Sequence, residues 1–201
     1  MYSQYNEEEY ILYYYKGFKG KFLDIGAHNG IDLSNTRALA ELGWSGVCVE
    51  PNPTVFSNLL KLYEQIHSVS VVNCAVDIES ELKMFSDNYD GYVSTLNKDH
   101  QDFFVKNHGS CYREMYLKTI KIEELFECFG FDFNFLSIDV EGMDLEILKT
   151  VPFEKLSKLS LLCVEHGHNP STVLDALNKY NFKPLVETKG NLILERIECQ
   201  T

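Results

Sequence analysis

From residue 20 onward, short apolar runs alternate with longer segments in which apolar residues recur at helical spacing. Each run ends at a glycine or an acidic residue, or just before one, as buried strands of a parallel sheet do. These runs predict five core strands, at residues 21–26, 46–50, 69–76, 133–139 and 159–165.

The segments between these strands carry helix signals. Asn52-Pro53 and Asn169-Pro170 each place an N-capping asparagine before a proline in the first helical turn. Each start leads into an amphipathic stripe. The stripe residues are Val55, Leu59, Leu62 and Ile66 after the first start, and Val173, Leu177 and Tyr180 after the second. Other helices are predicted at about residues 34–43 and 143–149, with a short one that ends near residue 130.

The middle and the C-terminus follow other patterns. Residues 182–187 and 191–198 surround a short turn and predict a terminal β-hairpin. Residues 81–85 and 117–122 have the pattern of added strands. Residues 86–116 mix aromatic and polar positions, and we expect an irregular excursion near a substrate site.

Repeated strand–helix units predict a parallel sheet with helices on both faces. With the terminal hairpin, the fold class is α/β: a doubly wound, mostly parallel seven-stranded sheet with a C-terminal antiparallel hairpin. The chain has no linker rich in proline, glycine or serine and no internal repeat. We therefore expect a single domain over residues 1–201.

Tyrosines gather near the N-terminus, where six of the 12 lie between residues 2 and 15. Tyr10, Tyr13 and Tyr14 fit one or two faces of a helix within residues 1–20. We prefer the interpretation that this helix packs on the sheet edge. The alternative is an aromatic lid or a stacking surface over a ligand.

Composition narrows the partners and the compartment. The formal net charge is −12 at pH 7 and no basic run relieves it, so we expect no nucleic-acid partner. No apolar run approaches the roughly 18–20 residues that span a bilayer. The first ten residues, MYSQYNEEEY, carry acids where a secretory leader carries bases. We expect a cytoplasmic protein without a membrane span.

The arrangement of the cysteines also favours a cytoplasmic protein. They are scattered and form no C-x-x-C pair, which disfavours a disulfide framework or a zinc site. Their positions are Cys48, Cys74, Cys111, Cys128, Cys163 and Cys199.

Polar residues stand at or just past the end of every predicted core strand, where a parallel α/β sheet binds its ligands. They are Asp24, Glu50, Asp77, Asp139, Glu141, Glu165, His166 and His168. Glu141 could instead be a solvated acid that complements a helix dipole, and the two histidines could be surface loop residues.

The turn after the first strand, FLDIGAHNGI, raises the question of a nucleotide. A dinucleotide fold uses G-x-G-x-x-G to admit a pyrophosphate, whereas this turn has Gly26-x-x-x-Gly30 with Asp24 before it. A carboxylate repels a pyrophosphate but suits the amino group of a zwitterion. Glu50, 20 residues after Gly30, is placed to accept hydrogen bonds from two ribose hydroxyls. A ligand with a ribose and no phosphate, such as S-adenosylmethionine, satisfies both acids.

Five blocks occur in order along the chain: DIGAHNG, VCVEPNP, NCAV, SIDVEGMDLEIL and VEHGHN. Together they resemble the FkbM family of S-adenosylmethionine-dependent methyltransferases over about residues 3–195. The resemblance implies the Rossmann-like class I methyltransferase fold and methylation of hydroxyl oxygens, mostly of sugars and other secondary metabolites. Asp144 departs from the family's D-V-E-G-x-E pattern, which usually has glutamate there.

The resemblance also implies roles for individual residues. The methionine end of the cofactor would meet Asp24, Gly26 and His28, and the ribose would meet Glu50. Asn52 either positions Glu50 or only caps its helix. The adenine would lie against Ala75 and Val76, with Asp77 nearby. The transferred methyl group and the acceptor would face Asp139, Glu141, Glu165 and His166.

Methyl transfer to a hydroxyl needs a base or a metal to take up the proton. Asp139 and His166 are the candidates for the base. Alternatively, Asp139, Glu165 and His166 could hold a divalent cation, Mg²⁺ or Mn²⁺. We prefer the version without a metal.

The leading hypothesis is therefore an O-methyltransferase that acts on a sugar, a glycan or a related metabolite, within or beside a larger glycan-synthesis protein or assembly. A non-catalytic S-adenosylmethionine-binding interaction domain is the second hypothesis, and the acids after the fourth and fifth strands disfavour it. An NAD-dependent oxidoreductase is the third, and the missing G-x-G-x-x-G disfavours it.

Overall fold

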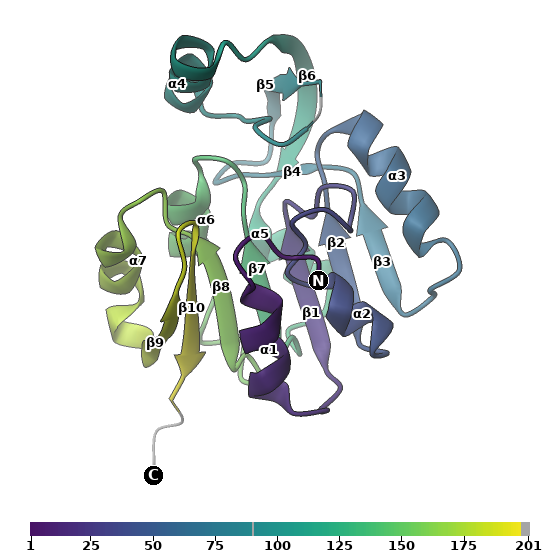
Figure 1. Cartoon of the computed structure of the whole chain (residues 1–201), viewed down its shortest axis with the longest axis vertical. Coiled ribbons are helices and arrows are strands. Elements are labelled where there is room, and N and C mark those ends of the chain that lie inside the picture. Colours follow the sequence, from purple (N-terminus) through teal and green to yellow (C-terminus); the bar gives the residue numbers. More distant parts are fainter. Residues whose placement is uncertain (90, 198–201) are drawn as a thin grey trace.

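The computed structural model describes residues 1–89 and 91–197 (Figure 1). Glu198, the last residue of the expected hairpin, and Cys199 lie outside the described residues. The main sheet has seven strands in the order β3-β2-β1-β7-β8-β10-β9. They are β1 (Lys21–Ile25), β2 (Ser45–Val49), β3 (Val69–Val72), β7 (Phe135–Ile138), β8 (Leu161–Glu165), β9 (Phe182–Glu187) and β10 (Asn191–Arg196).

The strand directions confirm the predicted fold class. Strands β1, β2, β3, β7 and β8 pair in parallel, and β10 is antiparallel to both β8 and β9. Ile25 pairs with Val49 on one side and with Ile138 on the other. Three neighbouring strands therefore end at one level, and the residues that follow them meet at one edge of the sheet.

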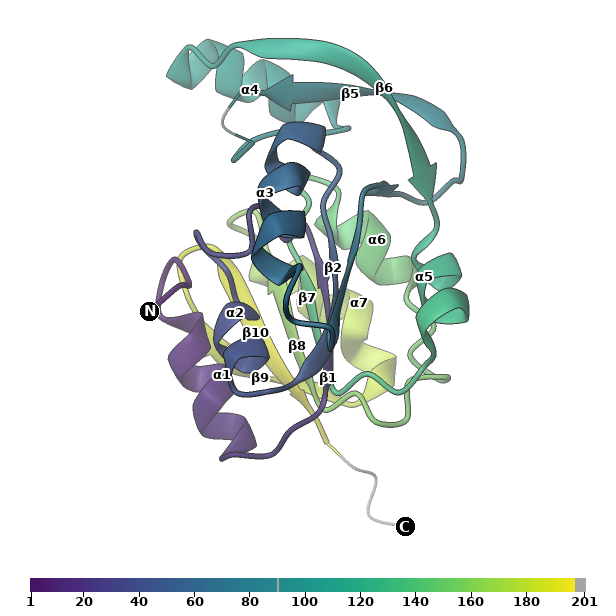
Figure 2. The ribbon, with the colours of Figure 1, turned by 90° about the vertical axis from the view of Figure 1, so that its right-hand side faces the viewer.

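Helices cover both faces of this sheet (Figure 2). One layer holds α1 (Glu7–Tyr15), α2 (Arg37–Glu41) and α3 (Pro53–Tyr63), and the other holds α5 (Ile122–Phe129), α6 (Asp144–Thr150) and α7 (Pro170–Leu177), which a 3₁₀ turn (Asn178–Tyr180) follows. Side chains of β1 face both layers. Phe22 packs in the first hydrophobic core, between the sheet and the layer of α1, α2 and α3, and Leu23 and Ile25 pack in the second core, between the sheet and the layer of α5, α6 and α7. None of the helices in the described ranges has the length and apolar character that crossing a membrane demands.

The N-terminal aromatic helix is shorter than the expected 1–20 segment. Ile11 and Tyr15 of α1 pack in the first core against residues of β7, β8 and β10, so the helix covers a face of the sheet rather than its edge. The Tyr15 hydroxyl donates to the Asn134 carbonyl at 2.8 Å, and its ring meets Trp44 edge-on at 4.6 Å. Burial and these contacts explain the tyrosine at residue 15, whereas Tyr10 and Tyr13 are exposed.

The predicted strand at residues 69–76 is two strands in two sheets. β3 ends at Val72, and β4 (Ala75–Val76) leaves the main sheet to pair with β6 (Tyr112–Ile120). Asn73 makes the break, because its side-chain amide donates to the Glu50 carbonyl at 2.8 Å and to the Pro51 carbonyl at 3.1 Å. The apolar run did not reveal this break, because both halves are apolar.

Residues 86–116 are not the irregular excursion that the sequence predicts. Most of them belong to β5 (Leu82–Asn88), α4 (Lys98–His108) and β6, and the seven pairs from Leu82–Lys118 to Asn88–Tyr112 join the two strands as an antiparallel ribbon. Asn97 caps the start of α4 by accepting from two backbone amides. We call β5, α4, β6 and the segments between them the arm. It stands over one end of the main sheet (Figures 1 and 2).

Gly26 allows the turn after β1 to contact the loop after β7, and substitution of this glycine tests how far the contact constrains the fold. Gly26 has φ +86°, and a Cβ there would overlap the backbone carbonyl of Asp139. Gly17 has φ +85° and open space around it. Gly17→Ala should lower the free energy of unfolding by about 1–2 kcal/mol for the left-handed backbone, and Gly26→Ala by about 2–5 kcal/mol because overpacking adds to that cost. Urea denaturation measures both, and equal losses would show that the contact does not constrain the fold.

Candidate active site

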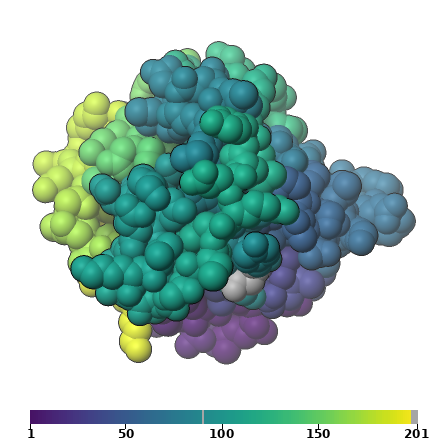
Figure 3. Space-filling model, turned by 90° about the horizontal axis from the view of Figure 1, so that it is seen from above, coloured from purple at the N-terminus to yellow at the C-terminus, as the bar shows by residue number. Residues whose placement is uncertain are grey.

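A pocket lies beneath the arm, where β1, β2 and β7 end. Its walls come from the turn after β1, the end of β2, the loop after β7, the segment around β4 and the arm itself. Figure 3 looks down on this end of the molecule, and the teal residues of the arm cover its centre. Segments distant in sequence thus enclose one space.

Asp24 occupies the floor of this pocket and is 5% exposed. Its carboxylate accepts a hydrogen bond from the Thr36 hydroxyl at 2.6 Å. Burial raises the pKa of Asp24 to about 6, although hydrogen bonds from Thr36 and Ser137 oppose that shift. A buried carboxylate with spare lone pairs attracts a cationic group of a ligand.

Glu50 is held more tightly, by backbone amides on both of its oxygens. The His28 amide donates to Oε2 at 2.9 Å and the Asn52 amide donates to Oε1 at 2.7 Å. Burial raises the pKa of Glu50 to about 7; these two hydrogen bonds oppose the shift, and the charges of Asp24 and Asp87 add to it. The fixed carboxylate lines the pocket and keeps lone pairs for two neighbouring hydroxyls.

His28 and Asn52, whose backbone amides hold Glu50, each make further contacts. His28 lies at φ +49° and its ring stacks on Tyr92 of the arm at 4.4 Å. Asn52 both caps α3, by accepting from the Thr54 and Val55 amides, and supports Glu50 through its own backbone amide. The two roles left open for Asn52 by the sequence are therefore both present in the structure.

Another part of the pocket lining is apolar. Ala75 and Val76 of β4 line it together with Cys74 and Phe85. Asp77, the next residue, does not line the pocket, because its carboxylate pairs with Lys83 at 2.7 Å. Apolar residues and a carboxylate in one pocket suit a ligand with a flat ring at one end and hydroxyls beside it.

Three acids gather where β7 and β8 end. One carboxylate oxygen from each of Asp139, Asp144 and Glu165 lies within 4.8 Å of the others, and Asp139 also lines the pocket. The Val140 amide at 2.8 Å and the Gly142 amide at 3.1 Å hold Asp144. Desolvation first, and then repulsion among the acids, raises the pKa of Asp139 well above its usual value and that of Glu165 to about 11. Glu165 in its protonated form donates to Asp144.

Glu141 connects this acid cluster to the arm. Its carboxylate lies 3.1 Å from Nε2 of His100 in α4, and its carbonyl accepts from the Thr95 hydroxyl at 2.6 Å. Burial and the charge of Asp144 raise the pKa of Glu141 to about 8. Glu141 is thus neither fully solvated nor part of the cluster of three acids.

His166 lies apart from the acid cluster, in an open groove beside Tyr5 and the β9–β10 turn. Its Nε2 lies 3.1 Å from the Thr188 carbonyl, and its Nδ1 accepts from the His168 amide at 3.1 Å. These partners require the proton on Nε2 and occupy the Nδ1 lone pair. His166 as the base stays a prediction, and this arrangement disfavours it.

Several residues of the site had no signal in the sequence analysis. Tyr92, Thr95 and His100 reach the pocket or its loop from the arm, and no motif marks them. Asp144 did have a signal, because it lies three residues after Glu141 in the D-V-E-G-M-D stretch. The structure places it with Asp139 and Glu165, in the position that the sequence analysis gave to His166.

The mostly parallel sheet, the buried carboxylate at the end of β2 and the acids after β7 are the arrangement typical of class I S-adenosylmethionine-dependent methyltransferases. The methyltransferase FkbM domain model matches residues 24–184, and the chain belongs to the FkbM family. No curated protein matches the chain.

Solved structures agree on the fold. The chain is similar to the methyltransferase FkbM from Methylobacillus flagellatus KT, with 16% identity and a TM-score of 0.53 over 88% of this chain and 43% of that one. It is also similar to a ribosomal protein L11 methylase from Lactobacillus delbrueckii subsp. bulgaricus, with 10% identity and a TM-score of 0.50 over 96% and 78% of the two chains. A protein of the NADB-Rossmann superfamily from Streptococcus agalactiae gives 10% identity and a TM-score of 0.52 over 100% and 72%. The chain spans less than half the length of the FkbM structure.

The acid cluster should lower the free energy of unfolding in a pH-dependent way. The folded-state pKa of Glu165, about 11, lies above its usual value of 4.5, so the protein loses stability as pH rises from 4.5 toward 11. Glu165→Gln removes this titration, and the free energy of unfolding should exceed that of the wild type at pH 8 and converge with it near pH 4. Urea denaturation at several pH values measures the difference. Glu146→Gln, at an exposed acid of α6, is the control and should show no such trend; a parallel gain in both variants would contradict the cluster's role.

Proposed function

We propose that this methyltransferase transfers the methyl group of S-adenosylmethionine to a hydroxyl oxygen of a sugar, a glycan or a related metabolite. One observation carries the proposal: the carboxylates of Glu50 and Asp139 line the same pocket, one held by backbone amides and the other with a strongly raised pKa. The first suits recognition of a ribose, and the second suits acceptance of a proton.

The pocket residues fit the cofactor that the family uses. Glu50 would accept hydrogen bonds from both ribose hydroxyls, Ala75 and Val76 would contact the adenine, and Asp24 would accept from the amino group. Gly26 and His28 line the same end of the pocket as Asp24. When bound, S-adenosylmethionine supplies an electrophilic methyl group on a cationic sulfur.

Asp139 is the proposed base. An acceptor hydroxyl would give its proton to the ionised Asp139 carboxylate as its oxygen forms the new bond to carbon. A raised pKa makes that carboxylate a stronger proton acceptor. Burial is the first cause of the raised pKa of Asp139, and the charges of Glu141 and Asp144 add to it. Holding the acceptor oxygen in line supplies the rest of the acceleration.

The charge of the site supports an uncharged acceptor. Asp24, Glu50, Asp139 and Glu141 all line the pocket, and the whole chain carries a formal charge of −12. These carboxylates repel an anionic acceptor, whereas they accept hydrogen bonds from a polyhydroxyl compound. The exposed ring of Tyr92 on the pocket wall adds a surface on which a sugar ring can stack.

A metal-dependent version is the second candidate, because carboxylate oxygens from Asp139, Asp144 and Glu165 lie within 4.8 Å of one another. Mg²⁺ or Mn²⁺ prefers such oxygen ligands. In this version Asp144 takes the place of His166 in the ligand set expected from the sequence. We favour the metal-free version, in which a proton shared between Glu165 and Asp144 relieves the repulsion.

The acid cluster also weighs against a non-catalytic binding domain, since cofactor binding alone requires only the Asp24 and Glu50 side of the pocket. A place within or beside a larger glycan-synthesis protein or assembly is part of the same proposal.

Glu50→Ala tests the cofactor site. The affinity for S-adenosylhomocysteine should fall by about 1.5–3 kcal/mol, because hydrogen bonds to a charged group are lost. Isothermal titration calorimetry measures this change. Asp132→Ala, at an exposed acid near the opposite end of β1, should bind as the wild type does. In thermal-shift measurements S-adenosylhomocysteine should stabilise the wild type and NAD should not; the reverse would refute the proposed donor.

Asp139→Asn tests the chemistry. Formation of S-adenosylhomocysteine in the presence of a panel of neutral sugars and glycans should fall by about 10²–10⁴-fold, the usual contribution of a general base, while affinity for S-adenosylhomocysteine stays within a few-fold. His166→Ala is the comparison and should keep turnover near that of the wild type. Turnover should also survive EDTA. Loss on chelation with recovery in Mg²⁺ or Mn²⁺ would establish the metal-dependent version instead.

A further inference from the structure

One buried acid of the arm has no part in the mechanism above. Asp87 lies on β5, is 2% exposed and faces the start of α3. A buried carboxylate is costly unless charged or polar partners surround it. Its partners therefore indicate what it stabilises.

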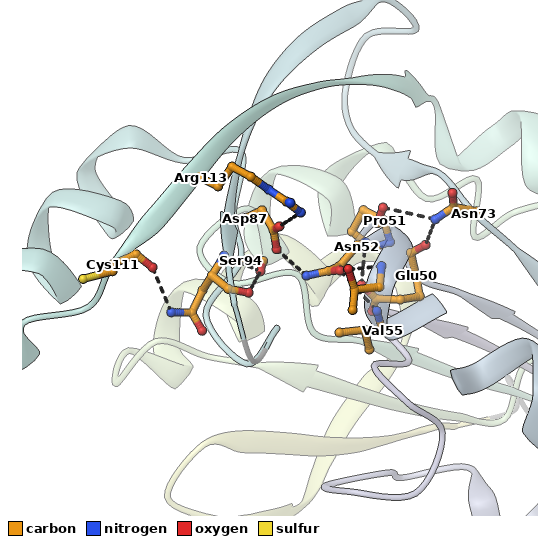
Figure 4. Close-up of polar contacts among 11 residues, drawn as sticks. Glu50, Pro51, Asn52, Val55, Asn73, Asp87, Ser94, Cys111 and Arg113 are labelled. Carbon is orange, nitrogen blue, oxygen red and sulfur yellow. Dashed lines mark hydrogen bonds and ion pairs between the residues drawn. The ribbon is translucent and has the colours of Figure 1, made fainter. Parts of the chain in front are cut away.

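Asp87 has one partner on each oxygen, and both appear in Figure 4. The Arg113 guanidinium donates to Oδ2 at 2.6 Å, from the residue directly opposite on β6. The side-chain amide of Asn52 donates to Oδ1. Asp87 thus connects the arm to the residue that begins α3.

The bond to Asp87 fixes which way the Asn52 side chain faces. With its NH₂ group directed at Asp87, its carbonyl oxygen faces α3 and accepts from the Thr54 amide at 2.9 Å and the Val55 amide at 3.2 Å. The same residue's backbone amide donates to Glu50 at 2.7 Å. A continuous hydrogen-bonded series therefore runs from Arg113 through Asp87 and Asn52 to Glu50 (Figure 4).

We infer that Asp87 is a positioning residue for the cofactor ribose: it orients Asn52, and Asn52 holds Glu50 in the geometry that binds two hydroxyls. The inference rests on the proposed function, since it concerns the same Glu50 site. It assigns the arm a role in binding the methyl donor, although no part of β5 had that role in the sequence analysis.

Asp87 also acts on Glu50 through its charge. Glu50 is faced by Asp24 from β1, by Asp87 from β5 and by the backbone amides of His28 and Asn52, and Arg113 partly offsets the charge of Asp87. Burial is the first cause of the raised pKa of Glu50, and the negative charges of Asp24 and Asp87 add to it. Removal of the charge of Asp87 should lower this pKa, whereas a purely structural role for Asp87 would leave it unchanged.

Calorimetry with S-adenosylhomocysteine tests the inference on four variants of the full chain. Asp87→Ala leaves the Asn52 amide without its acceptor and should weaken binding about tenfold. Asn52→Ala should weaken binding similarly, and the double variant should be no weaker than Asn52→Ala alone, because both changes interrupt one series. Glu7→Gln alters another buried, hydrogen-bonded carboxylate and should bind as the wild type does.

A pH series supplies the readout that does not depend on the alanine variants folding. Asp87→Asn keeps the shape and an acceptor oxygen for Asn52. In the wild type, affinity should rise with pH through about 7 as Glu50 ionises, and in Asp87→Asn this rise should occur at lower pH. Wild-type affinity in Asp87→Ala, additive effects in the double variant or an unmoved pH midpoint would overturn the inference. Absence of binding by the wild type would instead refute the proposed function.

Discussion

The site depends on one close approach, between the backbone of Gly26 and the carbonyl of Asp139. Neighbouring parallel strands are joined by hydrogen bonds only as far as Ile25 and Ile138, and the chain beyond them would diverge. The Asp139 amide extends the pairing by donating to the Ile25 carbonyl at 2.9 Å, and the Gly26 amide donates to the Val49 carbonyl at 3.0 Å. Because Gly26 has no side chain, the loop that bears Asp139 can pack directly against the turn after β1. The turn that supports Glu50 and the loop that bears Asp139 are therefore parts of one packed unit.

That unit concentrates negative charge where water is scarce. Asp24, Glu50, Asp139 and Glu165 all have a pKa above the usual range, and burial is the first cause in each case. The fold tolerates this because backbone amides and hydroxyls face the acids from the turns, as His28 and Asn52 do for Glu50. A stability loss of this kind is typical of sites that bind cations or accept protons.

The sequence predicted correctly those features that depend on interactions between residues near in sequence. The apolar runs that carry Asp24, Glu50 and Asp139 at or near their ends predicted the core strands and their acidic ends, and Asn52-Pro53 predicted the start of α3. The break at Asn73 did not show, because it arises from a hydrogen bond to a carbonyl 23 residues away. The arm was predicted only in part. Residues 81–85 and 117–122 were expected as added strands and overlap β5 and β6, but α4 and the pairing of the two strands were not expected. The pairing joins segments distant in sequence, and the pattern of exposed and buried residues along β5 does not alternate regularly. The strand-end rule correctly brought Glu165 near Asp139, but it could not show that the next side chain, His166, bonds to the β9–β10 turn.

The arm makes the two halves of the pocket interdependent. On the ribose side, Asp87 bonds to Asn52; on the acid side, Thr95 bonds to the Glu141 carbonyl, and Asn97 donates to the Gly142 carbonyl at 2.8 Å. Within the sheet, the Gly26–Asp139 contact and the hydrogen bonds around it hold these halves together. The arm supplies the second connection, at the top. Because Asp87, Thr95 and Asn97 connect the arm to both of the loops that carry acids, a displacement of the arm by an acceptor would act on Glu50 and on the Asp139 loop together.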